Sequence, residues 1–158
     1  MTGRPGMTVQ EQNKAMTLRV FEEAFNGGDL SVIDDVLVDG SVDHQEALGA
    51  DFAEHLKDVV RKMRATFPDL RFEVHHVLAE GDMVATHSTM TGTHEGRFEI
   101  GTFRDIPPTG RRIEVPHMHF FRWAGGKNTD LWHVWDTPTL MSQLGAPQQA
   151  PEREDASV

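Results

Sequence analysis

The sequence has 158 residues, the length of one ordinary domain, and its 38% hydrophobic and 25% charged residues are a globular composition. A formal net charge of −10 argues against a partner held through phosphate contacts, so no nucleic acid is expected. The absence of cysteine excludes disulfides, thiolate metal sites and cysteine nucleophiles. No apolar run approaches the roughly 20 residues that span a bilayer, and the N-terminus lacks a signal-peptide pattern. We therefore expect no membrane association and a cytoplasmic location.

The two ends differ in composition from the middle of the chain. Residues 1–8 are rich in Gly and Pro, and residues 147–158 consist mainly of Pro, Gln and charged side chains. Segments with so little to bury are expected to be disordered tails. They flank one predicted domain at residues 9–146.

The first third of the chain predicts helices. Thr8 opens a capping box, and the helical apolar stripe that follows ends at Gly27-Gly28. Asp29 is suited to cap a second, short helix, and Asp51 begins a third.

After residue 68 the apolar period changes from 3.6 to 2, which is typical of strands. Gly-containing turns separate strands predicted at residues 70–78, 83–92, 111–123 and 129–136, and a short helix follows at 138–144. Three helices followed by hairpin-connected strands indicate an α+β fold. We expect a cone-shaped domain in which a curved antiparallel sheet wraps around the three helices and encloses a small-molecule cavity.

Strict alternation assigns side chains to the two faces of the last two strands. Val115, His117, His119 and Phe121 share one face of the first, and Trp132, Val134 and Asp136 share one face of the second. If both faces are concave, two imidazoles, two aromatic rings and one carboxylate meet in one pocket. The pocket then suits proton transfer, because apolar surroundings raise the pKa of a carboxylate toward the working pH.

Asp136 has two interpretations from spacing alone. At the end of a strand and before Thr137-Pro138-Thr139, it is a natural N-cap for the last helix. Within the predicted pocket it is instead a candidate general base, with a neighbouring histidine to orient it or to stabilise an enolate oxygen.

The His117-x-His119 pair also has the spacing of a strand-borne metal site, which His133 or Asp136 could complete. Two observations argue against a metal. The Glu that follows His-x-His in cupins is replaced here by Trp123 or Ala124, and alternation places His133 on the wrong face. We therefore expect no metal and no cofactor.

The remaining histidines give weaker signals. His44 lies in a stretch between helices that is predicted to be irregular, and it is a candidate for the roof of the pocket or for the surface. His94 is ambiguous in the same way. His75-His76 straddles both faces of its strand, so at most one of the two points inward.

Five segments together resemble the SnoaL-like polyketide cyclases, also called the ester cyclase family, of the nuclear-transport-factor-2-like superfamily. The matching segments are residues 25–30, 67–70, 81–96, 107–111 and 126–145, the last with a Trp four residues before an Asp and then Gln143-Leu144-Gly145. Departures from the family pattern are a longer loop at 97–105 and Asn128, which replaces an aliphatic residue.

The resemblance implies cofactor-free ring closure by an intramolecular aldol reaction on a polyketide-like or aromatic carbonyl substrate. It implies an acid/base aspartate at Asp136 and a supporting histidine at His119 or His117. Trp132, Phe121, Val134, His44 and His94 are then expected to bind the substrate. A non-catalytic binding protein, a hydroxylase and an isomerase stay open as alternatives, and a homo-oligomer, dimer or tetramer, is expected.

Overall fold

The computed structural model describes residues 6–46, 49–100 and 105–145. Apart from residues 6–8, the two predicted tails lie outside this part of the chain. In chain order the elements are α1 Val9–Arg19, the π-helical segment η1 Val20–Asn26, α2 Ser31–Val36, β1 Leu37–Asp43, α3 Phe52–Thr66, β2 Arg71–Glu80, β3 Met83–Thr93, β4 Arg112–Ala124, β5 Lys127–Trp135 and α4 Thr137–Leu144.

The strands form one curved five-stranded sheet in the order β1-β5-β4-β3-β2. The predicted α+β class is confirmed, but the sheet is mixed, because β1 runs parallel to β5. The expectation of irregular structure between the second and third helices is therefore wrong for residues 37–43. This edge strand carries Gly40 and two exposed residues before it, Val38 and Asp39, so it lacks an alternating pattern that could have revealed it.

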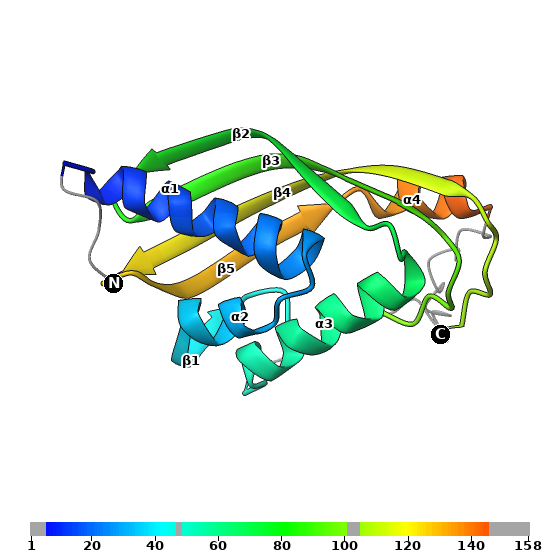
Figure 1. Cartoon of the computed structure of the whole chain (residues 1–158), viewed down its shortest axis with the longest axis horizontal. Helices are drawn as coiled ribbons and strands as arrows, with labels where there is room; N and C mark the ends of the chain where they lie inside the picture. Colours follow the sequence, from blue (N-terminus) through cyan, green and yellow to red (C-terminus); the bar gives the residue numbers. More distant parts are fainter. Residues whose placement is uncertain (1–5, 47–48, 101–104, 146–158) are drawn as a thin grey trace, which may run out of the picture.

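The helices α1 and α3 begin where their caps predict, but the N-cap of α2 is Leu30 and not the predicted Asp29, whose carboxylate accepts from the Ser31 N–H. The Thr8 hydroxyl accepts a hydrogen bond from the backbone N–H of Glu11, and Asp51 accepts one from Glu54. Figure 1 shows α1, α2 and α3 on one side of the sheet, with α4 at its far end. None of the helices in the described ranges combines the length and apolarity needed to cross a membrane.

Asn26 fastens the helical layer to the sheet at the end of η1. Its side-chain amide donates to the carbonyl oxygen of Phe72 at 3.0 Å and accepts from the Phe72 N–H at 2.7 Å. The Arg64 guanidinium donates to the carbonyl oxygens of Phe25 and Asn26, which closes the end of the helix against α3. These bonds hold η1 across the concave side of the sheet.

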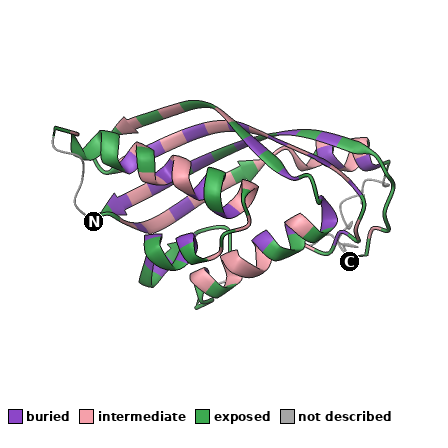
Figure 2. Cartoon of the chain, viewed as in Figure 1, coloured by how far each residue is buried: buried purple, intermediate pink, exposed green. Residues whose placement is uncertain are grey.

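Buried and less buried residues alternate along β3 and β4 (Figure 2). In the edge strand β2 a bulge interrupts this alternation. Val74 pairs with Ser88 and His76 pairs with His87, so His75 is an extra residue. After this bulge the inward face changes: Val77 packs partly against the core, whereas Leu78 is 69% exposed. His75 and His76 are both exposed.

A second bulge, in β5, decides which side chains of that strand face inward. Trp123 pairs with Asn128, but Arg122 pairs with Asp130, so Thr129 is the extra residue. The buried Asn128 side chain spans the bulge and donates to the carbonyl oxygens of Arg122 and Asp130 at 3.0 and 2.9 Å. Beyond it, each odd-numbered residue of β5 lies opposite an odd-numbered residue of β4.

We predict that Asn128→Leu destabilises the fold by about 2–4 kcal/mol, because two carbonyl groups at a buried position lose their donor. The free energy of unfolding in urea measures the effect. Gln12→Leu is the matched control, since Gln12 is an exposed amide on α1 and its replacement should change stability by no more than about 0.5 kcal/mol. Equal stability of the two variants would show that Asn128 does not hold the bulge.

Candidate functional site

A cavity of about 510 Å³ lies between the concave face of the sheet and the helices. Its size is that of a pocket for a small organic molecule. The apolar wall comes from η1, α3 and the sheet, and includes Phe21, Phe25, Phe52, Leu56, Val59, Met63, Phe72, Phe121, Leu131 and Trp135. Ile100, in the longer loop after β3, also lines it.

Three histidines, His117, His119 and His133, meet on the sheet wall of this cavity; we call them the three-histidine cluster. His117 and His119 are successive inward residues of β4, and His133 of β5 lies directly opposite His119. One ring nitrogen of each lies within 4.8 Å of the other two. The expectation that His133 faces away is wrong, because the bulge at Thr129 reverses the face of β5.

The cluster is largely shielded from water. Burial, and next the neighbouring His133, lowers the pKa of His117 to about 3. Burial likewise holds the pKa of His119 well below its ordinary value, and the other two histidines lower it further. Both rings of β4 are therefore neutral at physiological pH, and a neutral imidazole offers one N–H and one lone pair.

Asp43 and Gln45, at the end of β1, position His133. The Asp43 carboxylate is buried, and its Oδ2 lies 3.3 Å from His133 Nε2. Gln45 Oε1 accepts a hydrogen bond from the backbone N–H of His133 at 2.7 Å. Since a carboxylate only accepts, the ring nitrogen that faces Asp43, Nε2, carries a proton, and Nδ1 is the nitrogen that can hold the lone pair.

Sequence reasoning missed Asp43 and selected its neighbour His44 instead. The edge strand ends at Asp43, residues 44 and 45 form a turn, and the His44 N–H donates to the carbonyl of Leu131. Asp43 and Gln45 line the cavity, whereas His44 does not. Because residues 38–40 are all exposed, β1 has no alternating pattern, and no periodic signal in the sequence marks Asp43.

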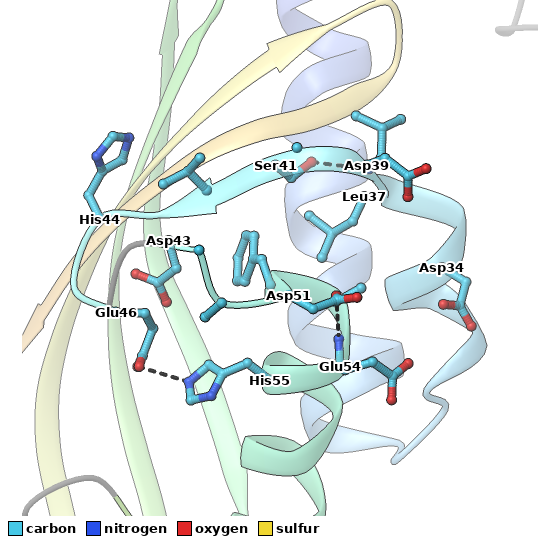
Figure 3. Close-up of a pocket in the computed structure, with 17 residues that line it drawn as sticks. Asp34, Leu37, Asp39, Ser41, Asp43, His44, Glu46, Asp51, Glu54 and His55 are labelled. Carbon is cyan, nitrogen blue, oxygen red and sulfur yellow. Dashed lines mark hydrogen bonds and ion pairs between the residues drawn. The ribbon is translucent and has the colours of Figure 1, made fainter.

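An outer groove of about 730 Å³ adjoins the cavity over β1 and the start of α3 (Figure 3). The two hollows share Leu37, Asp43, Glu46, Phe52 and His55. His55 and Glu46 form an ion pair of 2.8 Å where the hollows meet. The acidic side chains that line the groove are Asp34, Asp39, Asp43, Glu46, Asp51 and Glu54.

The other predicted pocket residues of β5 lie mostly on the outer face. Trp132 stacks on His44 with ring centroids 4.4 Å apart, and His44 also pairs with Asp130 at 2.8 Å. Val134 borders the cavity but is 65% exposed. Of the predicted binding residues, Phe121 alone stands among the inward side chains beside His117 and His119.

His94 is fully buried and does not line the cavity. Its Nδ1 bonds with the Thr109 hydroxyl at 2.9 Å, and its ring packs between Phe67 and Phe98. Burial lowers its pKa. These contacts are those of a core histidine that holds the loop before β4.

Asp136 caps α4, as the first interpretation from spacing predicts. Its Oδ1 accepts from the Thr139 N–H at 3.0 Å and its Oδ2 from the Thr139 hydroxyl at 2.6 Å. Asp136 is not among the residues that line the cavity. The Thr139 hydroxyl and N–H lower the pKa of this carboxyl, which is the opposite of the rise that a base in an apolar pocket would undergo.

We predict that Asp136→Ala lowers the midpoint of thermal unfolding. Asp136→Asn should lower this midpoint much less, because asparagine is an equally good N-cap. The lowered pKa means that the carboxylate contributes stability above the pKa of the unfolded chain, about 3.9. The advantage of the wild type over Asp136→Asn should therefore shrink as the pH falls below that value. An advantage that grows in acid would contradict the capping role.

The chain is similar to several solved structures. TsrD from Streptomyces laurentii covers 89% of this chain with 100% of its own length, at a TM-score of 0.77 and 23% identity, a likeness of fold. IdmH from Streptomyces antibioticus, provisionally assigned as a polyketide cyclase, is 29% identical with a TM-score of 0.71, over 85% of this chain and 99% of that one. AclR from Streptomyces galilaeus, provisionally assigned as a hydroxylase, is 28% identical with a TM-score of 0.72, over 90% and 87%.

No curated protein gave a significant match. The model of the family described as SnoaL-like polyketide cyclase matches residues 15–144. This match confirms the expected fold and an enzyme of the polyketide-cyclase type. The chain belongs to the SnoaL-like polyketide cyclase family.

Proposed function

We propose that this chain is a cofactor-independent cyclase that uses histidine and carboxylate groups for an aldol-type ring closure on a polyketide-like or aromatic carbonyl substrate. One observation carries the proposal: the carboxylate-bound His133 lies beside two neutral imidazoles on the wall of an apolar cavity of about 510 Å³. Family membership and the similarity to IdmH support the reaction class.

In this mechanism the general base is His133. Its Nδ1 takes the proton from a carbon flanked by carbonyl groups, and Asp43 balances the charge that the ring acquires. The resulting enolate carbon attacks a second carbonyl of the same molecule. A carbon–carbon bond forms, the carbonyl π bond becomes an alkoxide, and the proton returns from His133 to that oxygen.

The roles of His117 and His119 follow from their neutral state. A neutral ring has one N–H to donate, so His119, of which only Nδ1 is closed off within the described residues, can stabilise the enolate oxygen without competing for the proton. His117 stacks on the His119 ring with both of its own nitrogens buried. The aromatic wall, with Phe21 and Phe72 close to these rings, excludes water and strengthens such hydrogen bonds.

The family resemblance gives the base to Asp136, and we place it on His133 instead. Asp136 spends both carboxylate oxygens on Thr139, and those bonds favour its unprotonated, weakly basic form. The Asp43–His133 pair lies on the cavity wall. Asp43 takes the orienting place that the resemblance gives to a histidine.

We predict that His133→Gln lowers turnover about 10²- to 10⁴-fold, because the proton acceptor is lost. Asp43→Asn should also cost about 10²-fold or more, since the amide can donate to Nε2 and so move the ring proton to Nδ1. Aromatic polyketide esters with a methylene between two carbonyls are the test substrates. Deuterium exchange at that methylene, followed by NMR, reports proton abstraction separately from ring closure.

Asp136→Asn is the control, because it keeps the cap of α4. It should retain exchange and ring closure. Loss of both in Asp136→Asn with full activity in His133→Gln would return the base to Asp136. Ligand binding with no exchange in the wild type, for any of these esters, would favour the non-catalytic binding protein.

We propose further that the chain is a homo-oligomer whose copies meet through the outer face of the sheet. The helices cover the other face, and this one exposes Met118, Phe120 and Val134 on its central strands. Their row neighbours include His87, Ala85 and Trp132, with no acidic residue among them. In a chain of net charge −10, a second copy meets apolar rather than acidic side chains at the centre of this face, and the nearby Asp130 is paired with Arg122.

Phe120→Glu should therefore lower the molar mass in solution, measured by light scattering after size exclusion, to that of one chain. Val9→Glu is the control, because Val9 is also exposed, at 62%, but lies at the start of α1. A wild type that is monomeric at micromolar concentration, or a mass that Phe120→Glu leaves unchanged, would contradict this interface.

A further inference from the structure

Most ring nitrogens of the three-histidine cluster have no hydrogen-bond partner within the described residues. Both ring nitrogens of His117 and the Nδ1 atoms of His119 and His133 are buried and find no partner in the described part of the chain. His117 and His119 are 7% and 6% exposed, so bulk water does not satisfy these atoms. Buried polar atoms without partners usually indicate a missing ligand, water or ion.

The spacing of the three rings suits one ion. The three candidate nitrogens already lie within 4.8 Å of one another. Around a tetrahedral zinc with bonds of 2.0–2.1 Å, such nitrogens are roughly 3.4 Å apart. Side-chain rotations that move each ring nitrogen by about an ångström would bring the nitrogens to this spacing. The strand register holds His119 and His133 opposite each other.

The state of the rings also favours coordination. Metal ligands must be unprotonated imidazoles. The Asp43 carboxylate on Nε2 directs the lone pair of His133 to Nδ1, which is its unpartnered atom. A carboxylate behind a histidine is the usual outer-shell support of a zinc ligand.

We propose that His117, His119 and His133 bind one divalent transition-metal ion of the zinc type, with Asp43 as the outer-shell carboxylate. Three imidazoles select Zn²⁺, Co²⁺, Ni²⁺ or Cu²⁺ over Mg²⁺ and Ca²⁺, which take oxygen ligands. Three protein ligands leave a fourth coordination position for a water molecule or another ligand.

Metal binding also regulates the proposed cyclase, and this part rests on the proposed function. The Nδ1 lone pair of His133 that accepts the substrate proton is the one that coordinates the ion. An occupied site therefore has no free base. Zinc should act as an inhibitor that competes with the substrate and that a chelator removes.

The direct test is metal binding by untagged, chelator-treated protein, measured by calorimetry with Zn²⁺ and by visible absorption with Co²⁺. We expect one ion per chain and the intense absorption of Co²⁺ with fewer than six ligands. Each of His117→Ala, His119→Ala and His133→Ala should abolish this spectrum. Asp43→Asn should weaken affinity about 10- to 100-fold.

The matched control is the surface histidine pair on β2 and β3. His76 and His87 bond to each other through Nδ1 at 3.1 Å on the exposed face. His76→Ala with His87→Ala should leave the single tight site intact. A wild type that binds no Zn²⁺, or a site lost only in this double variant, would overturn the inference.

Folding defects in the cluster variants do not affect a second measurement on the wild type. Anomalous scattering from a crystal soaked in Zn²⁺ should give its strongest peak between the three rings, and a strongest peak elsewhere contradicts the site. If the protein binds zinc but shows no turnover in the metal-free form, the proposed cyclase activity is contradicted and the metal site is not. Turnover that Zn²⁺ does not inhibit removes the regulatory role.

Discussion

The arrangement of the site depends on one irregularity, the bulge at Thr129 that Asn128 spans. A regular hairpin from the turn at Gly125-Gly126 would place the even-numbered residues of β5 opposite the inward residues of β4. The extra residue reverses this, so His133 and Trp135 enter the cavity and Trp132 turns outward. Asn128 donates to one carbonyl on each strand at the bulge, which explains why an amide stands at a buried position.

Burial then gives the site its chemistry. An imidazole in an apolar cavity resists protonation, so the two histidines of β4 offer lone pairs and donors rather than positive charge. Within the described residues, a carboxylate contacts His133 but neither of the two histidines of β4, which makes this ring different from its neighbours. The asymmetry assigns proton transfer to His133 and hydrogen bonding to His119. It arises because β1, the edge strand that carries Asp43, pairs with β5 in parallel.

Local signals in the sequence predicted the fold well. The capping residues Thr8 and Asp51, and the Gly-containing turns between the later strands, marked the elements to within a few residues. The face of a strand was predictable only up to the first bulge. His75 and Thr129 each insert one residue, and nothing in their type distinguishes them from regular strand residues.

The candidate site was therefore predicted in part. His117, His119 and Phe121 come before any irregularity in β4, and alternation placed them correctly on the cavity wall. His133 follows the bulge in β5, and Asp43 lies on a strand without an alternating pattern, so neither was assigned to the site. The local sequence around Asp136 is compatible with a helix cap and with a general base. The two roles could be distinguished only by whether the carboxylate lines the cavity, and it does not.

The most direct test of the Asp43–His133 pair is the protonation pattern of His133 in solution, measured from two-bond ¹⁵N–¹H correlations of the imidazole rings. We expect a hydrogen on Nε2, none on Nδ1, and nuclear Overhauser contacts between the rings of His133 and His119. A hydrogen on Nδ1, or a His133 ring without contact to His119, would contradict this arrangement.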